Sequence, residues 1–536
     1  MGAFYVGNSG LQTSQNALNT TAHNLANIDT TGYTRQQVYQ ENKYLMDVGV
    51  SYNNKLQVGL GVSYSEVRAV RDFFMDRQYR TDAGRSSYYS TSYEVIQEIN
   101  TMFGETEGAE FQTAYQDLRD VVMDLGNAPT DPTVQSEVIS RSLQFLNRAQ
   151  SIYEGLVRYQ NNLNQQIQDQ VGKINDYANQ IVELNEKIVS VEAAKVESAN
   201  DLRDARDSIL DKLSSLGRIT YSENGYGMVD VQFEGVDLVK GNYANPMEAK
   251  VLPGDEDSGF YTPVWSKYED QNVFNMKQEI SADVGSDVGS LKALVISRGT
   301  KNATYKDMEE QTVTDKNGNP VTLSAFESFD LMAGSPITAI MTEFDHLING
   351  IVTGMNNLLA DPLRDTDGEL ILDSDGNPQY QKEELFSLIT TMEDGGGYTT
   401  ANLRINPDLL RQPTLLNDGF VLEDLSTDQE TADALVAMFQ DDFSTLNPGT
   451  TTPLNFEEYY IDIVDQYANI GNAYKVASEA QEQALLSAES SRQQVVGVSD
   501  NEELTKMVRY QNAYNSSSRY INTINSMLDT LITMVS

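Results

Sequence analysis

Two short acidic stretches come nearest to a metal-binding pattern in this sequence. They are Asp365–Gly368 and Asp373–Gly376, and each places two aspartates just before a glycine. A calcium loop has an acidic first ligand, glycine at position six and glutamate at position twelve. Counting back five residues from the two glycines gives Leu363 and Ile371, which offer no side-chain oxygen. Since Asp-Gly is a strong turn dipeptide, we interpret both stretches as turns.

Other residue types with catalytic or metal-binding chemistry are sparse. The chain has no cysteine, which excludes thiolate metal sites, disulfides and cysteine nucleophiles. Its two histidines, His23 and His346, are too distant in sequence for a zinc-binding helix. No nucleophile elbow, phosphate loop or dinucleotide fingerprint occurs. We expect no metal, no cofactor and no enzymatic activity, although a catalytic carboxylate pair would leave no signature among 79 acidic residues.

The composition limits the possible partners. The chain has 536 residues and a formal net charge of −42, so binding to nucleic acid or to an anionic membrane is not expected. No apolar run is long enough to span a bilayer, so we expect no membrane insertion. Residues 1–28 carry no charged side chain, and a classical cleaved signal peptide needs a basic start. If the protein is secreted, we expect another route.

Both ends of the chain carry a helical seam, with residues repeating at alternating spacings of three and four. This heptad pattern is typical of helices that pack against each other. The first seam consists of Phe4, Gly7, Leu11, Ser14, Leu18, Thr21, Leu25 and Ile28. The second consists of Met507, Tyr510, Tyr514, Ser517, Ile521, Ile524, Leu528, Leu531 and Val535. We predict that the two terminal helices pair with each other.

The outer face of the first helix is polar but uncharged. A solvated helix normally carries Glu–Lys pairs, and asparagine, serine and threonine are mediocre helix formers. The helix should therefore be marginal unless it is packed. Two interpretations stay open: an ordinary intramolecular pair, or a pair that also contacts neighbouring subunits. In the second case the candidate assembly contacts are Phe4, Leu11, Leu18, Leu25, Ile28, Met507, Tyr514, Ile521, Ile524, Leu528, Leu531 and Val535.

Between the ends, helical and β-like periodicities alternate. The predicted helices are 71–102, 133–191 after an Asp-Pro start, 198–216 after a Ser198–Asp201 capping box, 337–359, and further helices within the acidic stretch 411–475. The predicted β segments are pieces of the connector 33–72, the period-two region 219–281, Val313–Leu323 and Glu369–Leu372. The fold class is therefore mainly α with an inserted β domain, an α+β multi-domain chain. We expect paired terminal coiled-coil helices, a long helical bundle and an outward β-rich domain.

We divide the chain into five segments. They are the N-terminal helix and motif (1–35), the connector and long-helix domain (36–218), the β-rich outer domain (219–281), a second helical part with a β excursion near 300–330 (282–503), and the C-terminal helix (504–536).

The stretch Leu18–Gln36 resembles the N-terminal motif of the axial proteins of the bacterial flagellum, which include rod, hook and hook-associated proteins. The motif residues are Asn24, Asn27, Thr31, Gly32, Tyr33, Arg35 and Gln36. The continuation through Arg35 and Gln36 is similar to the hook-associated protein 1 family rather than to hook or rod proteins. Residues 497–531 resemble the other end of that family, with Ile524–Ser526 and residues 300–330 as departures.

The resemblance implies a non-enzymatic structural role. Members of this family form a ring adaptor of many copies at the hook–filament junction, between the hook protein and the second junction protein, hook-associated protein 3. They leave the cell through the flagellar export channel without a cleaved signal peptide, so the implied location is extracellular. A cytoplasmic flagellar export chaperone is expected to mask the C-terminal helix beforehand. The alternatives are a secreted surface adhesin with a coiled-coil stem and an exported cell-wall hydrolase.

Overall fold

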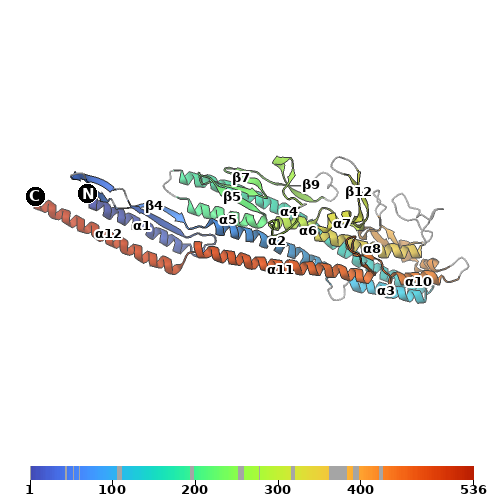
Figure 1. Cartoon of the computed structure of the whole chain (residues 1–536). Coiled ribbons are helices and arrows are strands. Elements are labelled where there is room, and N and C mark those ends of the chain that lie inside the picture. The colour runs from blue at the N-terminus through green and yellow to red at the C-terminus, as the bar shows by residue number, and fades with distance from the viewer. Residues whose placement is uncertain are drawn as a thin grey trace.

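The protein is mainly helical and elongated, and both ends of the chain lie at the same end of the molecule (Figure 1). The computed structural model describes residues 2–42, 45–51, 54–59, 61–104, 111–193, 198–251, 259–276, 278–314, 320–360, 383–389, 397–421 and 426–535. A terminal helix pair continues into a longer body of helices and small sheets. The predicted fold class, mainly α with inserted β elements, is confirmed.

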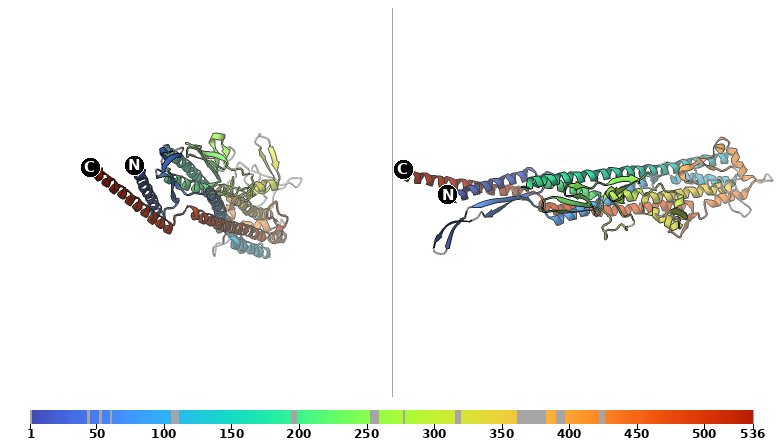
Figure 2. Two further views of the ribbon diagram at one scale, coloured as in Figure 1. Left: turned by 60° about the vertical axis from the view of Figure 1, so that its left-hand side comes forward. Right: turned by 90° about the horizontal axis from the view of Figure 1, so that it is seen from above.

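The terminal pair consists of α1 (Gly2–Ala26) and α12 (Asp500–Val535), which lie side by side (Figures 1 and 2). Gly7 lies against Ile521, whereas Asn24 near the other end of α1 bonds to Glu503, so the helices are antiparallel. The predicted pairing of the two ends is therefore present within one chain. The first helix ends in a turn at Gly32, whose φ of +80° suits glycine.

The connector after α1 forms two antiparallel ribbons. Strand β1 (Gln36–Asn42) pairs with β4 (Val62–Ala69) and returns the chain along α1. Strands β2 (Leu45–Ser51) and β3 (Asn54–Gly59) form a hairpin between them, which projects away from the helix pair (Figure 2, right). The extended character predicted for this connector is confirmed.

Long helices form the body. They are α2 (Phe73–Phe103), α3 (Phe111–Asn127), α4 (Pro132–Glu192), α5 (Asn200–Leu216) and α11 (Phe456–Val496). Helix α4 has 61 residues and begins at Asp131, whose side chain accepts a hydrogen bond from the Thr133 backbone N–H, as the Asp-Pro start predicts. Helix α3 was not among the helices predicted from the sequence.

The predicted capping box at the start of α5 is wrong. The N-cap residue is Ala199, which makes no side-chain capping bond. The Ser198 hydroxyl instead donates to Glu66 on β4, at 2.8 Å. The Ser198 hydroxyl therefore bonds to a distant strand instead of accepting from a backbone N–H of the helix, while the helix itself is present as predicted.

The period-two region forms two antiparallel sheets. The first has the order β5 (Ile219–Glu223), β6 (Val229–Phe233), β7 (Val236–Lys240) and β8 (Tyr243–Ala244), and the second joins β9 (Glu248–Val251), β10 (Tyr261–Trp265) and β11 (Gln271–Asn272). Val231 and Phe233 are buried, so the alternation predicted from the sequence is confirmed. The sheets share the apolar core of the long helices. The segment boundaries proposed from the sequence stay a prediction.

The remaining elements lie from the middle of the body to its far end. The helices are α6 (Ser290–Arg298), α7 (Ala325–Ala333), α8 (Pro336–Leu359), α9 (Pro407–Arg411) and α10 (Gln429–Met438). The strands form short hairpins: β12 (Gln311–Thr314) with β13 (Pro320–Leu323), β14 (Phe386–Leu388) with β15 (Leu403–Ile405), and β16 (Ser444–Thr445) with β17 (Pro453–Leu454). The β segment at 313–323 and the helix at 337–359 are thus confirmed. The two Asp-Gly stretches and the strand 369–372 lie outside the described residues.

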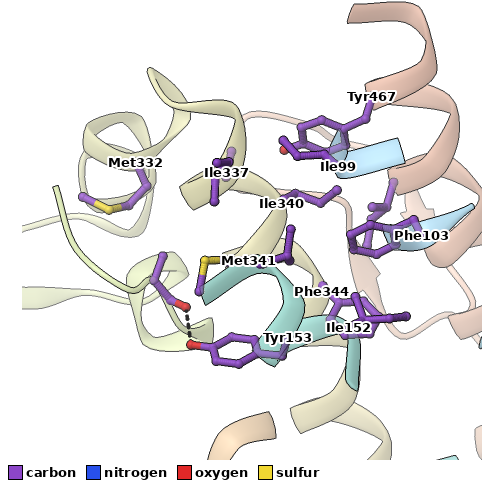
Figure 3. Packing of buried hydrophobic residues seen from close by; sticks show 14 of the residues in the cluster. Ile99, Phe103, Ile152, Tyr153, Met332, Ile337, Ile340, Met341, Phe344 and Tyr467 are labelled. Carbon is purple, nitrogen blue, oxygen red and sulfur yellow. Dashed lines mark hydrogen bonds between the residues drawn. The ribbon is translucent and has the colours of Figure 1, made fainter. Parts of the chain in front are cut away.

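One apolar core runs through the body and stops before the terminal pair. Near its centre, Phe344 of α8 packs edge-on against Phe103 and Phe111, and the Tyr153 hydroxyl donates to the Ala303 carbonyl at 3.0 Å (Figure 3). The core cluster includes no described residue of α1, β1–β4 or α12. The terminal pair must therefore be held to the body by other forces.

Candidate functional site: the terminal helix pair and its joint

The terminal pair packs through small residues more than through large ones. In α1 the buried side chains include Thr13, Ser14, Ala17 and Thr21. A Cβ added at Gly7 would lie 2.7 Å from Ile521 Cγ1, closer than real contacts allow. The helix axes approach closely because these residues are small, but little apolar surface is removed from water, so the pair is weakly held in one chain.

The predicted seam residues divide into half-buried and exposed sets. The half-buried set is Leu11, Leu18, Leu25, Ile28, Met507, Tyr514, Ile521 and Ile524. Phe4, Leu528 and Leu531 are 44%, 47% and 58% exposed, and the side chain of Val535 lies outside the described residues. A single chain therefore leaves the free end of the seam, at Phe4, Leu528 and Leu531, uncovered.

Both helices expose apolar side chains at their free end. Tyr5 follows Phe4 on α1 and is likewise exposed, and α12 exposes Met527, Ile532 and Met534 beside Leu528 and Leu531. Exposed apolar side chains gathered in this way are typical of a protein–protein contact.

At the other end of the pair, Asn24 is the centre of a fully satisfied hydrogen-bond cluster. Its side-chain N–H groups donate to the Gln36 carbonyl at 2.8 Å and to Glu503 Oε2 at 3.0 Å. Its Oδ1 accepts from the Tyr33 hydroxyl at 2.8 Å and from the Gln36 backbone N–H at 2.9 Å. The Asn24 side chain is 1% exposed, so this one amide fixes α1, β1 and α12 against each other.

The other motif residues shape the turn and anchor it. Asn27 donates to the His23 carbonyl at 3.0 Å, and Thr31 and Gly32 occupy the exposed turn. The Arg35 guanidinium pairs with Glu502 at 3.1 Å, and its backbone N–H donates to the Val496 carbonyl at 2.9 Å.

The Tyr33 ring is half-buried next to acidic groups. Burial, followed by the charges of Asp201, Asp204 and Glu503, raises the pKa of its hydroxyl well above the ordinary value. The hydroxyl therefore stays protonated, as its donation to Asn24 requires.

A charged network joins this cluster to the body. Arg71 pairs with Asp204 at 3.1 Å and with Asp207 at 2.6 Å, and it donates to the Thr34 hydroxyl at 3.2 Å. Burial raises the pKa of the Asp204 carboxyl, while Arg71 and the Thr34 hydrogen bonds oppose the rise. Arg80 and Arg492 extend the network to further aspartates of α2 and α5. We call the Asn24 cluster together with this charged network the joint between the terminal pair and the body. The joint is polar, whereas the core of the body is apolar.

Two cavities flank the joint. One, of about 620 Å³, lies between the turn 28–34 and the ends of α2, α5 and α11. The other, of about 680 Å³, lies between β4, the start of α2, α5 and β5. Arg71 lines both cavities, so its side chain is shared by their walls.

Within the described part of the chain, neither histidine belongs to a group of potential metal ligands. His23 is exposed and its Nδ1 lies 3.0 Å from the Tyr33 hydroxyl, whereas burial lowers the pKa of His346 to about 4. Among the described residues, no three His, Asp or Glu side chains are grouped as metal ligands. No helix in the described part of the chain combines the length and apolarity needed to cross a bilayer.

Sequence reasoning named the motif residues but missed their partners. Glu503 lies in the stretch 497–531 that resembles the other end of the family, but its bond to Asn24 was not predicted. Asp204 and Arg71 are tens to hundreds of residues from the motif, and their contacts with it were not predicted either. The seams predict that the two end helices pair, but the antiparallel direction that brings residues near 500 to residues near 24 comes from the structure.

Comparison with known protein families gives three matches. Residues 96–362 match the flagellar hook-associated protein FlgK helical domain, residues 4–34 match the flagella basal body rod protein family, and residues 492–534 match the C-terminal family of flagellar basal body rod FlgEFG proteins. The two rod-type matches fall on α1 with its turn and on α12.

Full-length relatives agree. The chain is 25% identical over 532 residues to flagellar hook-associated protein 1 of Bacillus subtilis (strain 168), covering 97% of this chain and 96% of the relative. It is 26% identical over 568 residues to the protein of the same name from Escherichia coli (strain K12), covering 98% of each. Its fold is similar to the flagellar hook junction protein FlgK from Burkholderia pseudomallei, with a TM-score of 0.52 and 15% identity over 79% of this chain and all of that one.

Proposed function

This chain belongs to the family of flagellar hook-associated protein 1, and we propose that it is a structural component of the bacterial flagellum at the hook–filament junction. The observation that carries the proposal is the terminal helix pair, locked at one end by Asn24 and Glu503 and left apolar and uncovered at the other. This arrangement suits a subunit whose ends are completed by neighbouring molecules. No catalytic role is proposed.

We propose further that many copies form an adaptor ring between the hook protein and hook-associated protein 3. The exposed apolar residues at the free end of α1 and α12 would be covered by these neighbours. The uncharged outer face of α1 supports this arrangement, because a charge buried between subunits without a partner costs several kcal/mol.

The same surface must be protected before assembly. We propose that a cytoplasmic flagellar export chaperone covers the C-terminal helix, and that the chain leaves through the flagellar export channel to an extracellular position. The run of exposed apolar side chains from Met527 to Met534 is the segment that needs such cover.

Deletion of the gene tests the junction role. The expected result is cells that carry hooks and release flagellin into the medium, with motility restored by the intact chain. An adhesin mutant would still swim, so normal swimming of the deletion strain contradicts the proposal. Zymography of the purified chain tests the alternative that it is a cell-wall hydrolase. Cell-wall material that is cleared by the parent chain, but not by a variant of one acidic residue, would indicate an enzyme.

Hydrogen exchange tests the source of order at the chain ends. Amides of α1 and α12 should exchange rapidly in the free chain and become protected in assembled junctions, because one chain covers only part of the seam. The amides of α4 serve as the control and should be protected in both states. Full protection of α1 and α12 in the free chain would contradict the proposal.

A further inference from the structure

One carboxyl group is enclosed in the apolar body, at Glu343 of α8. Glu343 is 0% exposed, and the core around it includes Ile340 and Phe344 of the same helix and Tyr467 of α11 (Figure 3). No basic side chain in the described part of the chain pairs with this carboxyl. Because a buried charge without a partner is strongly unfavourable, the site must be disturbed when Glu343 loses its proton.

The groups that bond to this carboxyl are neutral, and most of the distances are long. Asn447 Nδ2 donates to Oε1 at 3.1 Å, whereas Gln466 Nε2 lies 3.4 Å from both oxygens and the Tyr467 hydroxyl lies 3.4 Å from Oε2. Hydrogen bonds to an ionised carboxylate are shorter, about 2.7–2.9 Å from nitrogen and about 2.5–2.7 Å from a hydroxyl. The geometry therefore fits the protonated acid better than the carboxylate.

The proton on Glu343 is lost near neutral pH. Burial raises the pKa of Glu343 to about 7, and its hydrogen bonds oppose the rise. On α11, burial raises the pKa of Tyr459 and Tyr467 well above the ordinary value. On α8, burial lowers the pKa of His346 to about 4. The two tyrosines and the histidine therefore stay neutral while Glu343 titrates.

The other acid on this turn of α8 has firm partners. Asp345 Oδ1 accepts from the Thr400 backbone N–H and hydroxyl, both at 2.6 Å, and Oδ2 accepts from the Tyr305 backbone N–H at 2.9 Å. Burial raises the pKa of Asp345, and these hydrogen bonds oppose the rise. From α2, the residues in the same part of the core are the uncharged Ile99 and Phe103 (Figure 3). Asp345 is thus stabilised by short hydrogen bonds that Glu343 lacks.

A cavity adjoins the carboxyl on the side of its hydrogen-bond donors. It has a volume of about 430 Å³, and Asn447, Gln466 and Tyr467 all line it, together with apolar side chains such as Phe329 and Ile470. A water molecule needs about 30 Å³, so the cavity has room for several. Because the three donors lie in its wall, water from the cavity reaches the carboxyl only when one of them moves.

The hairpin that carries Asn447 is the most lightly built of the segments in contact. Strands β16 and β17 form only two residue pairs, whereas Glu343 lies on a helix of 24 residues and Gln466 on a helix of 41. Next to Asn447, Leu446 is buried and its carbonyl accepts from the Tyr459 hydroxyl at 2.7 Å. The hairpin is therefore the segment expected to move, and its movement would uncover Leu446.

We propose that Glu343 and Asn447 form a pH-sensitive latch, which holds the hairpin 444–454 closed on α8 and α11 while Glu343 is protonated and releases it when Glu343 is ionised. The pKa of Glu343 in the closed site lies above its ordinary value, so closure is stable at acidic pH and weakens as the pH rises through about 7. The latch does not depend on the proposed role at the hook–filament junction, and its test leaves that role unaffected.

Hydrogen exchange of the purified full chain at pH 6 and pH 9 tests the latch. After correction for the intrinsic effect of pH on exchange, the amides of residues 444–454 should open about tenfold more at pH 9. This factor follows from the rise of the pKa of Glu343 from 4.5 to about 7 on closure. The amides of α4 are the internal control, and their corrected exchange should be the same at both pH values.

Variants assign the effect to its residues. Glu343→Gln has a similar shape and cannot ionise, so the tenfold difference should disappear and the hairpin should stay closed at pH 9. Glu430→Gln, which changes an exposed acid on α10, is the matched control and should keep the difference. Asn447→Ala removes the shortest hydrogen bond to the carboxyl and should open the hairpin already at pH 6.

Two results would overturn the latch. The first is equal corrected exchange of residues 444–454 at pH 6 and pH 9 in the parent chain, a comparison that needs no variant to fold. The second is a tenfold difference that persists in Glu343→Gln, because another group would then control the hairpin.

Discussion

Asn24 and Glu503 are 479 positions apart in the chain, yet their side chains are joined by a hydrogen bond of 3.0 Å in a buried site. The Asn24 side chain donates two hydrogen bonds and accepts two. The Glu503 carboxylate also accepts a hydrogen bond from Lys506 Nζ at 2.7 Å. The first and last helices are thus connected by a specific polar contact, whereas large apolar residues supply only half-buried packing along the seam.

Asn24→Asp should disrupt the joint. The carboxylate cannot donate to Gln36 or Glu503 and faces the Glu503 charge, so we expect a loss of about 2–4 kcal/mol in terminal pairing. Non-motile cells and faster hydrogen exchange of residues 20–36 in junctions would report it. The double variant with Glu503→Gln supplies an amide donor and should recover part of the motility, while normal swimming of Asn24→Asp alone would contradict the role given to Asn24.

Leu18→Asp and Leu528→Asp should both prevent assembly, but for different reasons. Leu18 is half-buried in the pair, whereas Leu528 is 47% exposed in one chain. We therefore expect only Leu18→Asp to weaken pairing within the chain, and Leu528→Asp to leave thermal unfolding unchanged while swimming is lost. Asn525→Asp, a charge at an exposed polar position of the same helix, is the control and should swim. If the Leu528→Asp strain swims, the free apolar end of the pair is not part of the assembly surface.

Gly7→Val should force α1 away from α12. A Cβ at this position meets Ile521 at 2.7 Å, and the branched side chain adds further atoms on the same side. We expect shed flagellin and weak swimming. Gly172→Ala on α4 is the matched control, since a Cβ there meets no atom within 4 Å and the change should stabilise the helix by up to about 1 kcal/mol. Equal behaviour of the two variants would contradict the close approach.

Glu343→Gln should flatten the pH dependence of stability. Burial raises the pKa of Glu343 to about 7, and its partners Asn447, Gln466 and Tyr467 are neutral. Because this folded-state pKa lies above the unfolded value, the stability linked to Glu343 is present at acidic pH and lost as the pH rises through about 7. The glutamine variant should therefore gain roughly 3 kcal/mol relative to the parent at pH 9, measured by denaturant unfolding. If the stability of the variant and of the parent changes with pH in the same way, Glu343 is not a buried carboxyl without an ion pair.

The sequence predicted the long elements well because their signals are local. Heptad spacing indicated α1 and α12, the Asp131 cap and following proline marked the start of α4, and alternation marked β6. These patterns depend only on residues a few positions apart, so they survive in a single sequence.

The polar joint was not predictable in the same way. The partners of Arg71 lie on α2 and α5, and the partner of Asn24 lies on α12, so each contact depends on the tertiary arrangement. The wrong capping box has the same origin, because Ser198 bonds to Glu66 from a distant strand. Helix α3 was missed between two stronger patterns, although Phe111, Tyr115, Leu118 and Val122 recur at helical spacing and are buried.

The separation of Asn24 from Glu503 has a consequence for the order of events during biosynthesis. A ribosome makes residue 24 long before residue 503, so α1 has no α12 to meet until nearly all of the polypeptide exists. A product that stops before residue 503 keeps the body but cannot close the pair. Only a chain that carries both Asn24 and Glu503 can form this contact.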